Sequence, residues 1–245
     1  MSINCLSCNQ SGRKIKVHNS HELKYVVLPA RNVPLNALDL HNSAFSLWHK
    51  VWGDFWKERQ QPQLLSDTFV RQDEVSAIFH KEECVGLCLL ANHNLDLVAY
   101  RNDSYFSKVW PPSTHGILEK LGKNIIAGSH ITTAENWRRG NHGISMKELV
   151  IAMAILRFLN SKEDAMIGAM RKNRNVHQAA YKFGAQYLDS YHHEGTDLDI
   201  DLVIFERQNS KVDPQSELGK LAHDLWNNRI RLDWKDAQEN RAAAA

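Results

Sequence analysis

Apolar residues recur along the chain with two periods, and these periods predict alternating strands and helices. The pattern is clearest in the second half: 124–133 and 165–170 predict strands, and 144–160 and 176–183 predict helices. Residues 197–205 then alternate apolar and polar side chains, which predicts a further strand. Because a helix connects 124–133 to 165–170, we expect these two strands to lie parallel in one sheet.

The first half begins with β-favouring runs within 14–29 and continues with an aromatic helix over roughly 36–59. Aromatic side chains of this helix recur at spacings of three and four and share one face: Phe45, Trp48, Trp52 and Phe55. We expect this face to pack mainly in the core, while Trp48 and Trp52 are also candidates for a substrate pocket. The remaining predicted elements are strands at 68–71, 75–80 and 84–90, a short helix at 117–121 and a terminal helix at 214–235.

The composition is that of a globular domain, with 43% hydrophobic and 24% charged residues. We divide the chain into a tail (1–13), a main domain (14–210), a helical extension (211–235) and a second tail (236–245). The net charge of +2 gives no electrostatic case for a nucleic-acid partner. No apolar run approaches the roughly 20 residues that span a bilayer, and the N-terminus lacks a signal-peptide pattern, so we expect a cytoplasmic protein.

The cysteines do not predict a metal site. Cys5 and Cys8 form one C-x-x-C pair, but a structural zinc site needs a second matched pair or suitably spaced histidines. Cys84 and Cys88 lie in a predicted buried strand, where cysteine acts as a small apolar residue. We therefore expect no bound metal.

A segment rich in glycine and arginine joins the strand 124–133 to the helix 144–160. It contains Arg138, Arg139, Gly140 and Gly143. Unpaired amides at a helix N-terminus, next to glycines that allow close approach, form an anion site, and arginine adds bidentate contacts to phosphate. The pattern therefore predicts phosphate binding here.

This segment and a second one resemble the GNAT (N-acetyltransferase) superfamily, whose members include N-acyl amino acid synthases and autoinducer synthases. In that family a strand runs into an Arg/Gln-x-x-Gly-x-Gly/Ala loop that opens a helix, and the counterpart here runs from Ile131 to Ser145. Gly140 and Gly143 are three apart, so the loop carries one extra residue. Further along the family's sequences, an asparagine precedes a Tyr-x-x-x-Gly-Phe motif. In this chain Asn173 and Gly184 match that asparagine and the glycine of the motif without a gap. The resemblance covers about 70–205.

The resemblance implies an α/β (α+β) fold with a mixed, mostly antiparallel sheet flanked by helices, in which the strands near 124–133 and 165–170 are parallel and splayed. It also implies an acyl-CoA donor whose phosphates meet the loop. The residues that would contact the donor are Ile131, Thr132, Thr133, Arg138, Arg139, Gly140, Asn141, His142, Gly143, Ile144, Ser145 and Asn173.

Catalytic candidates lie at the end of the strand from which this family often supplies a base. They are His130, Ser129 and Glu135, and alternation along a strand places Ser129 and His130 on opposite faces. The tyrosine that serves the family as a general acid falls on Ala180. Its neighbour Tyr181 is turned by about 100° on the helix, so we expect it near the substrate pocket but not as the essential acid.

The leading hypothesis is acyl transfer from acyl-CoA to the amine of a small molecule or amino acid. One alternative is transfer of a long acyl chain from an acyl carrier protein to an amino acid. Another is a GNAT-like module that binds a ligand or protein without catalysis.

Overall fold

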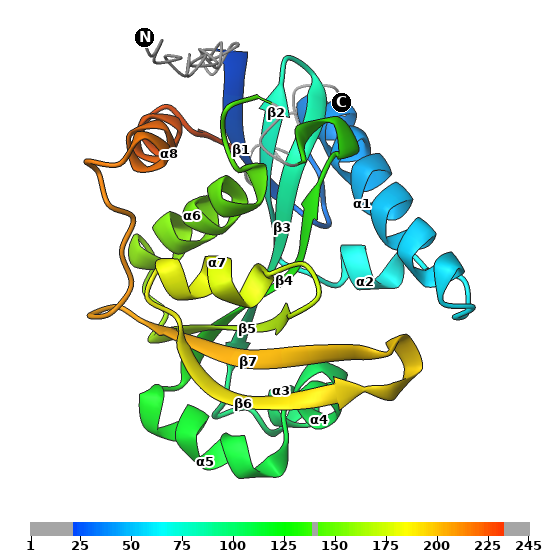
Figure 1. The fold of residues 1–245 in the computed structure, drawn as a ribbon, viewed down its shortest axis with the longest axis vertical. Coiled ribbons are helices and arrows are strands. Elements are labelled where there is room, and N and C mark those ends of the chain that lie inside the picture. The colour runs from blue at the N-terminus through cyan, green and yellow to red at the C-terminus, as the bar shows by residue number, and fades with distance from the viewer. Residues whose placement is uncertain (1–21, 139–141, 233–245) are drawn as a thin grey trace, which may run out of the picture.

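The computed structural model describes residues 22–138 and 142–232, and its centre is a mixed sheet of eight strands (Figure 1). Along the sheet the order is β6-β7-β5-β4-β3-β2-β1-β8. The strands are β1 (Leu23–Pro29), β2 (Glu74–His80), β3 (Glu83–Asn94), β4 (Asn124–Thr133), β5 (Ala165–Arg171), β6 (Gln186–His193), β7 (Leu198–Glu206) and β8 (Ile230–Arg231).

Two pairs of neighbouring strands are parallel, β4 with β5 and β1 with β8, and the other pairs are antiparallel. The pairing of β4 with β5 runs from Ile125–Ala165 to Gly128–Gly168 and then stops, although both strands continue. Both expectations are therefore confirmed: the sheet is mixed and mostly antiparallel, and these two strands are parallel and diverge.

Helices cover both faces of the sheet (Figure 1). One face carries α6 (Met146–Leu159), α7 (Val176–Lys182) and α8 (Glu217–Asn227), whose apolar side chains form one core cluster with the sheet. The opposite face carries α1 (Leu38–Glu58) and α2 (Asp67–Val70) over β1 to β3, in a second cluster. Below them, a third cluster includes residues from α4 (Ser104–Val109) and α5 (Pro112–Leu121), and α3 (Val98–Arg101) precedes these two helices. Short 3-10 turns are η2 (Leu35–Ala37), η3 (Glu135–Trp137) and η4 (Glu194–Thr196).

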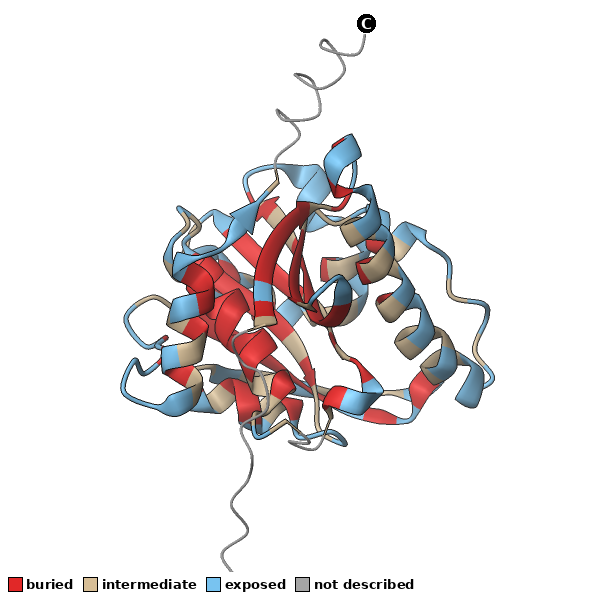
Figure 2. Cartoon of the chain, turned by 90° about the horizontal axis from the view of Figure 1, so that it is seen from above, coloured by how far each residue is buried: buried red, intermediate tan, exposed pale blue. Residues whose placement is uncertain are grey.

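Helix α6 is the main element of the core. It is apolar on nearly every side, and eleven of its 14 residues are buried, so it appears almost wholly red in Figure 2. Its buried Arg157 is compensated by a bidentate ion pair with Glu74 of β2, with both N–O distances at 2.7 Å. Gly86 of β3 lets α6 approach closely, because a Cβ there would lie 2.7 Å from Val150.

Several sequence predictions need correction. Residues 68–71 were predicted as a strand because of their apolar character, but 68–70 belong to α2, where Phe69 is fully buried against Trp48. The edge strand β6 is too polar to show a strand pattern and was missed. The terminal helix ends at Asn227 instead of 235, and β8 follows it.

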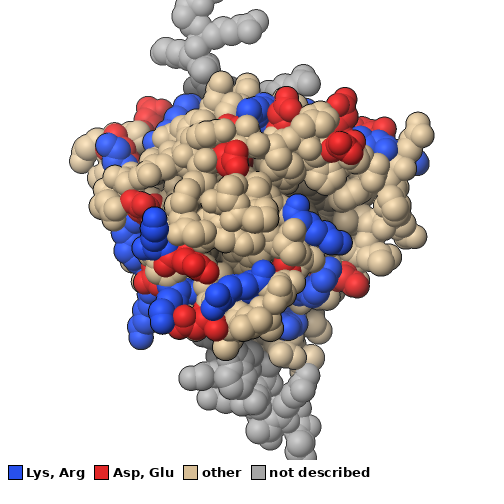
Figure 3. Space-filling view, turned by 90° about the horizontal axis from the view of Figure 1, so that it is seen from below, with Lys and Arg blue, Asp and Glu red and all other residues tan. Residues whose placement is uncertain are grey.

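The remaining sequence expectations concern cysteines, charge and membrane spans. Cys84 and Cys88 are free and buried in β3, as predicted, while Cys5 and Cys8 lie outside the described residues. Lysine and arginine are interspersed with aspartate and glutamate on the face shown in Figure 3. Within 22–138 and 142–232, no helix is long and apolar enough to cross a membrane, and no three His, Cys, Asp or Glu side chains are grouped to hold a metal ion.

Candidate active site

A β-bulge at the end of β4 changes where its side chains point. Leu89 of β3 pairs with Ser129 and Leu87 pairs with Thr132, so two residues of β4, His130 and Ile131, lie opposite one residue of β3. His130 has the left-handed backbone conformation, with φ of 52°. The expectation that Ser129 and His130 face opposite ways is therefore wrong, because Ser129 Oγ and His130 Nδ1 share a hydrogen bond of 3.1 Å.

The bulge lies where β4 and β5 diverge. Past Gly128 and Gly168, β4 stays paired with β3 and β5 stays paired with β7. In the described part of the chain, residues 129–133 therefore have no strand partner on the β5 side. We call this region, 129–133 of β4 with 169–171 of β5, the splay. Its open strand edge offers backbone N–H and C=O groups to a ligand.

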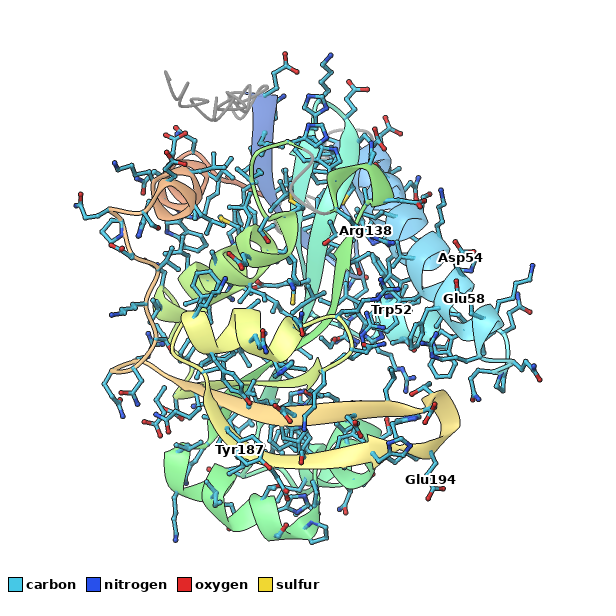
Figure 4. The ribbon with its side chains drawn as sticks, in the orientation of Figure 1. Trp52, Asp54, Glu58, Arg138, Tyr187 and Glu194 are labelled. Carbon is cyan, nitrogen blue, oxygen red and sulfur yellow. The ribbon has the colours of Figure 1, made fainter. Side chains whose placement is uncertain are left out.

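Helix α1 covers the splay from one face of the sheet. Trp52 donates a hydrogen bond from Nε1 to Thr132 Oγ1 (3.0 Å), and Thr132 Oγ1 donates to the carbonyl of His130 (2.6 Å). The ring of Trp52 also meets the His130 ring edge-on, with centroids 4.6 Å apart. Figure 4 shows Trp52 on the sheet side of α1 and the exposed Asp54 and Glu58 on its outer side. Trp48, the other pocket candidate, is fully buried in the core.

His130 is neutral at physiological pH. Burial, and then the positive charge of Arg171, lowers the pKa of His130 to about 4. Such a histidine is a weak base at pH 7, but its neutral ring accepts a hydrogen bond from a cationic group beside it. The third catalytic candidate, Glu135, lies in η3 beyond the strand and is exposed.

The N-terminus of α6 approaches the splay from the other face of the sheet, because the side chain of Met146 lies over Gly86 of β3, the partner of Thr133. Ser145 is its N-cap, and Ser145 Oγ accepts from the amide of Glu148 (3.4 Å), so the amides of Met146 and Lys147 remain without a helical partner. Gly143 has φ of 78°, a conformation that favours glycine. The loop is thus a glycine turn that leads into a helix with open amides.

Two further contacts bring the predicted donor segments together. Lys147 Nζ donates to the carbonyls of Arg174 (2.9 Å) and Asn175 (3.2 Å), which joins the start of α6 to the turn that contains the exposed Asn173. Arg138 Nε donates to the carbonyl of Thr133 (3.1 Å). The two motifs that lie far apart in the sequence are therefore neighbours at the splay.

Other predicted donor residues have structural contacts. The ring of His142 stacks on that of the buried Trp137, with centroids 3.8 Å apart. Ile131 and Ile144 pack against the cluster around α6. Arg139, Gly140 and Asn141 were also predicted to contact the donor, and they lie outside the described residues.

Tyr181 is held by a buried carboxylate. Its hydroxyl donates to Asp201 Oδ2 of β7 (2.7 Å), and Lys172 Nζ lies 3.0 Å from Asp201 Oδ1. Burial and the hydrogen bond to Asp201 raise the pKa of Tyr181, which makes it a poorer acid than free tyrosine. Ala180, which aligns with the family's tyrosine, is fully buried and has no acidic group.

Sequence reasoning identified Arg138 but missed Arg171, which lies at the splay. Arg171 ends β5, and its guanidinium carbon lies 4.7 Å from the centre of the Trp52 ring and 4.8 Å from that of Phe55. A usable signal was present, since Arg171 ends an apolar strand and is followed by Lys172 and Arg174.

No protein-family model and no curated protein matches this sequence. Among solved structures, the chain is similar to an N-acyl amino acid synthase from uncultured soil microbes (FeeM), at 12% identity and a TM-score of 0.52, covering 81% of this chain and 97% of that one. It is also similar to an agmatine N-acetyltransferase in its apo form, at 7% identity and a TM-score of 0.53, covering 75% and 99%. A third is a CoA-dependent acyl-homoserine lactone synthase (BjaI) with SAM and isopentyl-CoA, at 14% identity and a TM-score of 0.52, covering 85% and 92%.

At such low identity these likenesses show the fold. The chain has the GNAT fold, as its sequence motifs predicted, and its similar structures are acyltransferases of this type.

Proposed function

We propose that this chain is an N-acyltransferase that moves an acyl group from an acyl-CoA to the amine of a small molecule or amino acid. One observation carries the proposal: β4 and β5 part after Gly128 and Gly168, and the open edge of β4 lies beside the N-terminus of α6. The pantetheine arm of coenzyme A contains amide groups that can pair with an open strand edge as another strand does. Its phosphates match a helix N-terminus.

The proposed reaction is direct transfer. The amine nitrogen attacks the thioester carbonyl, a C–N bond forms, the C–S bond breaks, and the thiolate takes up the proton that the amine loses. Backbone N–H groups along 129–133 are the candidates for stabilising the oxyanion that develops on the carbonyl. The neutral ring of His130 accepts a hydrogen bond from the nitrogen as that atom becomes cationic, and Ser129 orients the ring.

Donor binding is assigned to the loop and the helix start. Gly143 allows close approach, the amides of Met146 and Lys147 meet phosphate, and Arg138 adds a positive charge. Coenzyme A binding, measured by calorimetry, should weaken at least tenfold in Gly143→Val, because a branched side chain is strained at this φ and holds phosphate away. Gly116→Val is a matched control. Gly116 lies in α5, away from the loop, and a Cβ there meets no atom within 4 Å.

The decisive experiment is turnover. Purified protein is incubated with acyl-CoA donors of increasing chain length and a panel of amines and amino acids, and both free thiol and N-acyl product are measured. We expect thiol release that requires an acceptor and an equal amount of product. If product forms only from acyl chains on a carrier protein, then the carrier protein, and not coenzyme A, carries the donor acyl group. No product from either donor would leave the non-catalytic module as the better hypothesis.

A further inference from the structure

Two other arginines, the buried Arg157 and the partly buried Arg207, have hydrogen-bond partners. Arg157 is paired with Glu74 through two hydrogen bonds of 2.7 Å, and Arg207 donates to the carbonyls of Leu159, Ser161 and Glu163 at 2.7–2.9 Å. The side chain of Arg171 differs, because within 22–138 and 142–232 it has no hydrogen bond and no ion pair. An unpaired guanidinium that is only partly exposed is costly.

Aromatic rings hold Arg171 in place. Its guanidinium lies over Trp52 and Phe55, and Arg59 lies over the same Phe55 ring, with its guanidinium carbon 4.0 Å from the ring centre. A guanidinium that stacks by its flat face keeps its N–H groups, which lie along its edge, available for hydrogen bonds. The arrangement therefore presents donors in a fixed orientation while pairing none of them.

Like charges surround Arg171. We call Arg59, Arg138, Arg171 and Arg174 the arginine cluster. Burial, and then the charges of Arg174, Arg59 and Arg138, lowers the pKa of Arg171 to about 10. In the described ranges, the carboxylate paired with this cluster is that of Glu58, 3.6 Å from Arg59 and largely exposed. The cluster thus has an excess of positive charge that a bound anion would relieve.

A second charged region provides a contrast. A hollow of about 250 Å³ at the β1–β8 edge of the sheet is lined by charges of both signs. There Arg31 lies 3.3 Å from Asp73 and Arg231 lies 3.6 Å from Glu74, so its charges pair with one another. Among the described residues, the arginine cluster has four positive charges and one paired carboxylate, so its charge is not balanced in this way.

Arg171 lies on the acceptor side of the splay. Along β5, Met166 and Met170 point to the cluster around α6, whereas Arg171 points to α1 on the opposite face. The amides assigned to the donor phosphates belong to α6. The tip of the β6–β7 hairpin closes this side, because Arg59 Nε donates to the carbonyl of Thr196 (3.0 Å) and Gln61 donates to that of Gly195.

One tryptophan relates the arginine to the reacting end of the site. The centre of the Trp52 ring lies 4.6 Å from the centre of the His130 ring. It also lies 4.7 Å from the guanidinium carbon of Arg171. His130 and Arg171 therefore contact the same ring, and the charge of Arg171 acts on His130. An acceptor whose amine lies at His130 can direct a neighbouring group towards Arg171, and in an α-amino acid the carboxylate is attached to the carbon that carries the amine.

We propose that Arg171 binds the carboxylate of the acyl acceptor and thereby selects α-amino acids over simple amines. The proposal rests on the proposed acyl transfer and specifies its acceptor. A carboxylate pairs with the free edge of the guanidinium through two parallel hydrogen bonds.

The test compares amino acids with the amines that lack only the carboxylate, such as phenylalanine with 2-phenylethylamine and leucine with 3-methylbutylamine. The wild type should favour each amino acid at least tenfold in kcat/KM, which corresponds to ~1.4 kcal/mol. In Arg171→Gln this preference should disappear, and Arg171→Lys should retain part of it. Arg229→Gln is the matched control, because it removes a guanidinium that also stacks on a tryptophan, Trp226, but lies outside the arginine cluster, and it should keep the preference.

A binding measurement separates this inference from the proposed function. Calorimetry without turnover measures the binding of an N-acyl amino acid and of its carboxamide. The wild type should bind the free acid at least tenfold more tightly than Arg171→Gln does, and the two proteins should bind the carboxamide alike. Coenzyme A should bind all variants alike, and thermal melts should show that each variant is folded. Equal use of amines and amino acids by an active wild type overturns the inference while leaving acyl transfer intact. If Arg171→Gln weakens coenzyme A and keeps the acceptor preference, the arginine binds donor phosphate instead.

Discussion

Acid should destabilise this protein through His130. The ring is packed against Trp52 and Trp48 and lies near the charge of Arg171, and these surroundings lower its pKa to about 4, whereas an unfolded chain would have a pKa of about 6.5. Between these values the unfolded state binds a proton and the folded state does not. The contribution of His130 to the free energy of unfolding is therefore fully present above pH 6.5 and is lost as the pH is lowered towards 4.

The magnitude follows from the two pKa values. A tenfold difference in proton affinity is worth about 1.4 kcal/mol. The difference between a pKa of about 6.5 in the unfolded state and about 4 in the folded state therefore corresponds to about 3 kcal/mol. Because His130 is partly exposed, solvent screens the charge, and we expect a loss of roughly 2 kcal/mol. Burial also lowers the pKa of His41 and His93, so the wild type should lose more than this amount in total.

The measurement that isolates His130 is a comparison of urea unfolding for the wild type and His130→Gln at steps between pH 7 and pH 4. The difference in unfolding free energy between the two proteins should shrink by roughly 2 kcal/mol over this range. Titration of the imidazole signals by NMR gives an independent pKa for the same ring. Parallel curves for the two proteins, together with an imidazole that titrates near pH 6.5, would refute the reasoning.

Three further outcomes are expected. Gly184→Ala should destabilise the fold by more than ~2 kcal/mol in thermal melts, because φ is 93° and a Cβ there would collide with the backbone carbonyl of the loop after β7. Tyr181→Phe should lower turnover less than roughly tenfold but cost about 1.5–3 kcal/mol of stability, since its hydroxyl is bound to Asp201; a hundredfold loss of turnover in a folded variant would reverse this assignment. In a double-mutant cycle, Trp52→Phe and Thr132→Val should couple by about 1 kcal/mol, and simple additivity would contradict the hydrogen bond between them.

Local patterns predicted the parts of the fold whose burial does not depend on distant residues. Strand β4 has the predicted bounds, and α6 begins two residues later than predicted and ends one residue earlier. The first half of β4 and nearly all of α6 are so apolar that any compact fold buries them. Gly184 also follows the end of α7 as predicted, because its φ of 93° favours glycine and a Cβ there would collide with the carbonyl oxygen of Asn209.

Long-range pairing decided the features that the sequence did not reveal. Nothing near His130 in the sequence shows that two residues of β4 oppose one residue of β3, so alternation gave the wrong face for its side chain. The segment that contains Phe69 has β-branched neighbours, yet packing against Trp48 makes it helical. The role of Arg171 depends on aromatic rings more than a hundred positions earlier in the chain.

The aromatic helix α1 has two functions that the spacing of its rings could not separate. Trp48 is fully buried, whereas Trp52, one turn later, lies at the point where β4 turns away from β5. From there Trp52 contacts Thr132, on the open strand edge proposed for the donor, as well as His130 and Arg171, on the side proposed for the acceptor. In the proposed reaction, a change in this one ring would therefore disturb donor pairing, proton transfer and acceptor binding together, so we expect α1 to position the two substrates relative to each other as well as to pack the core.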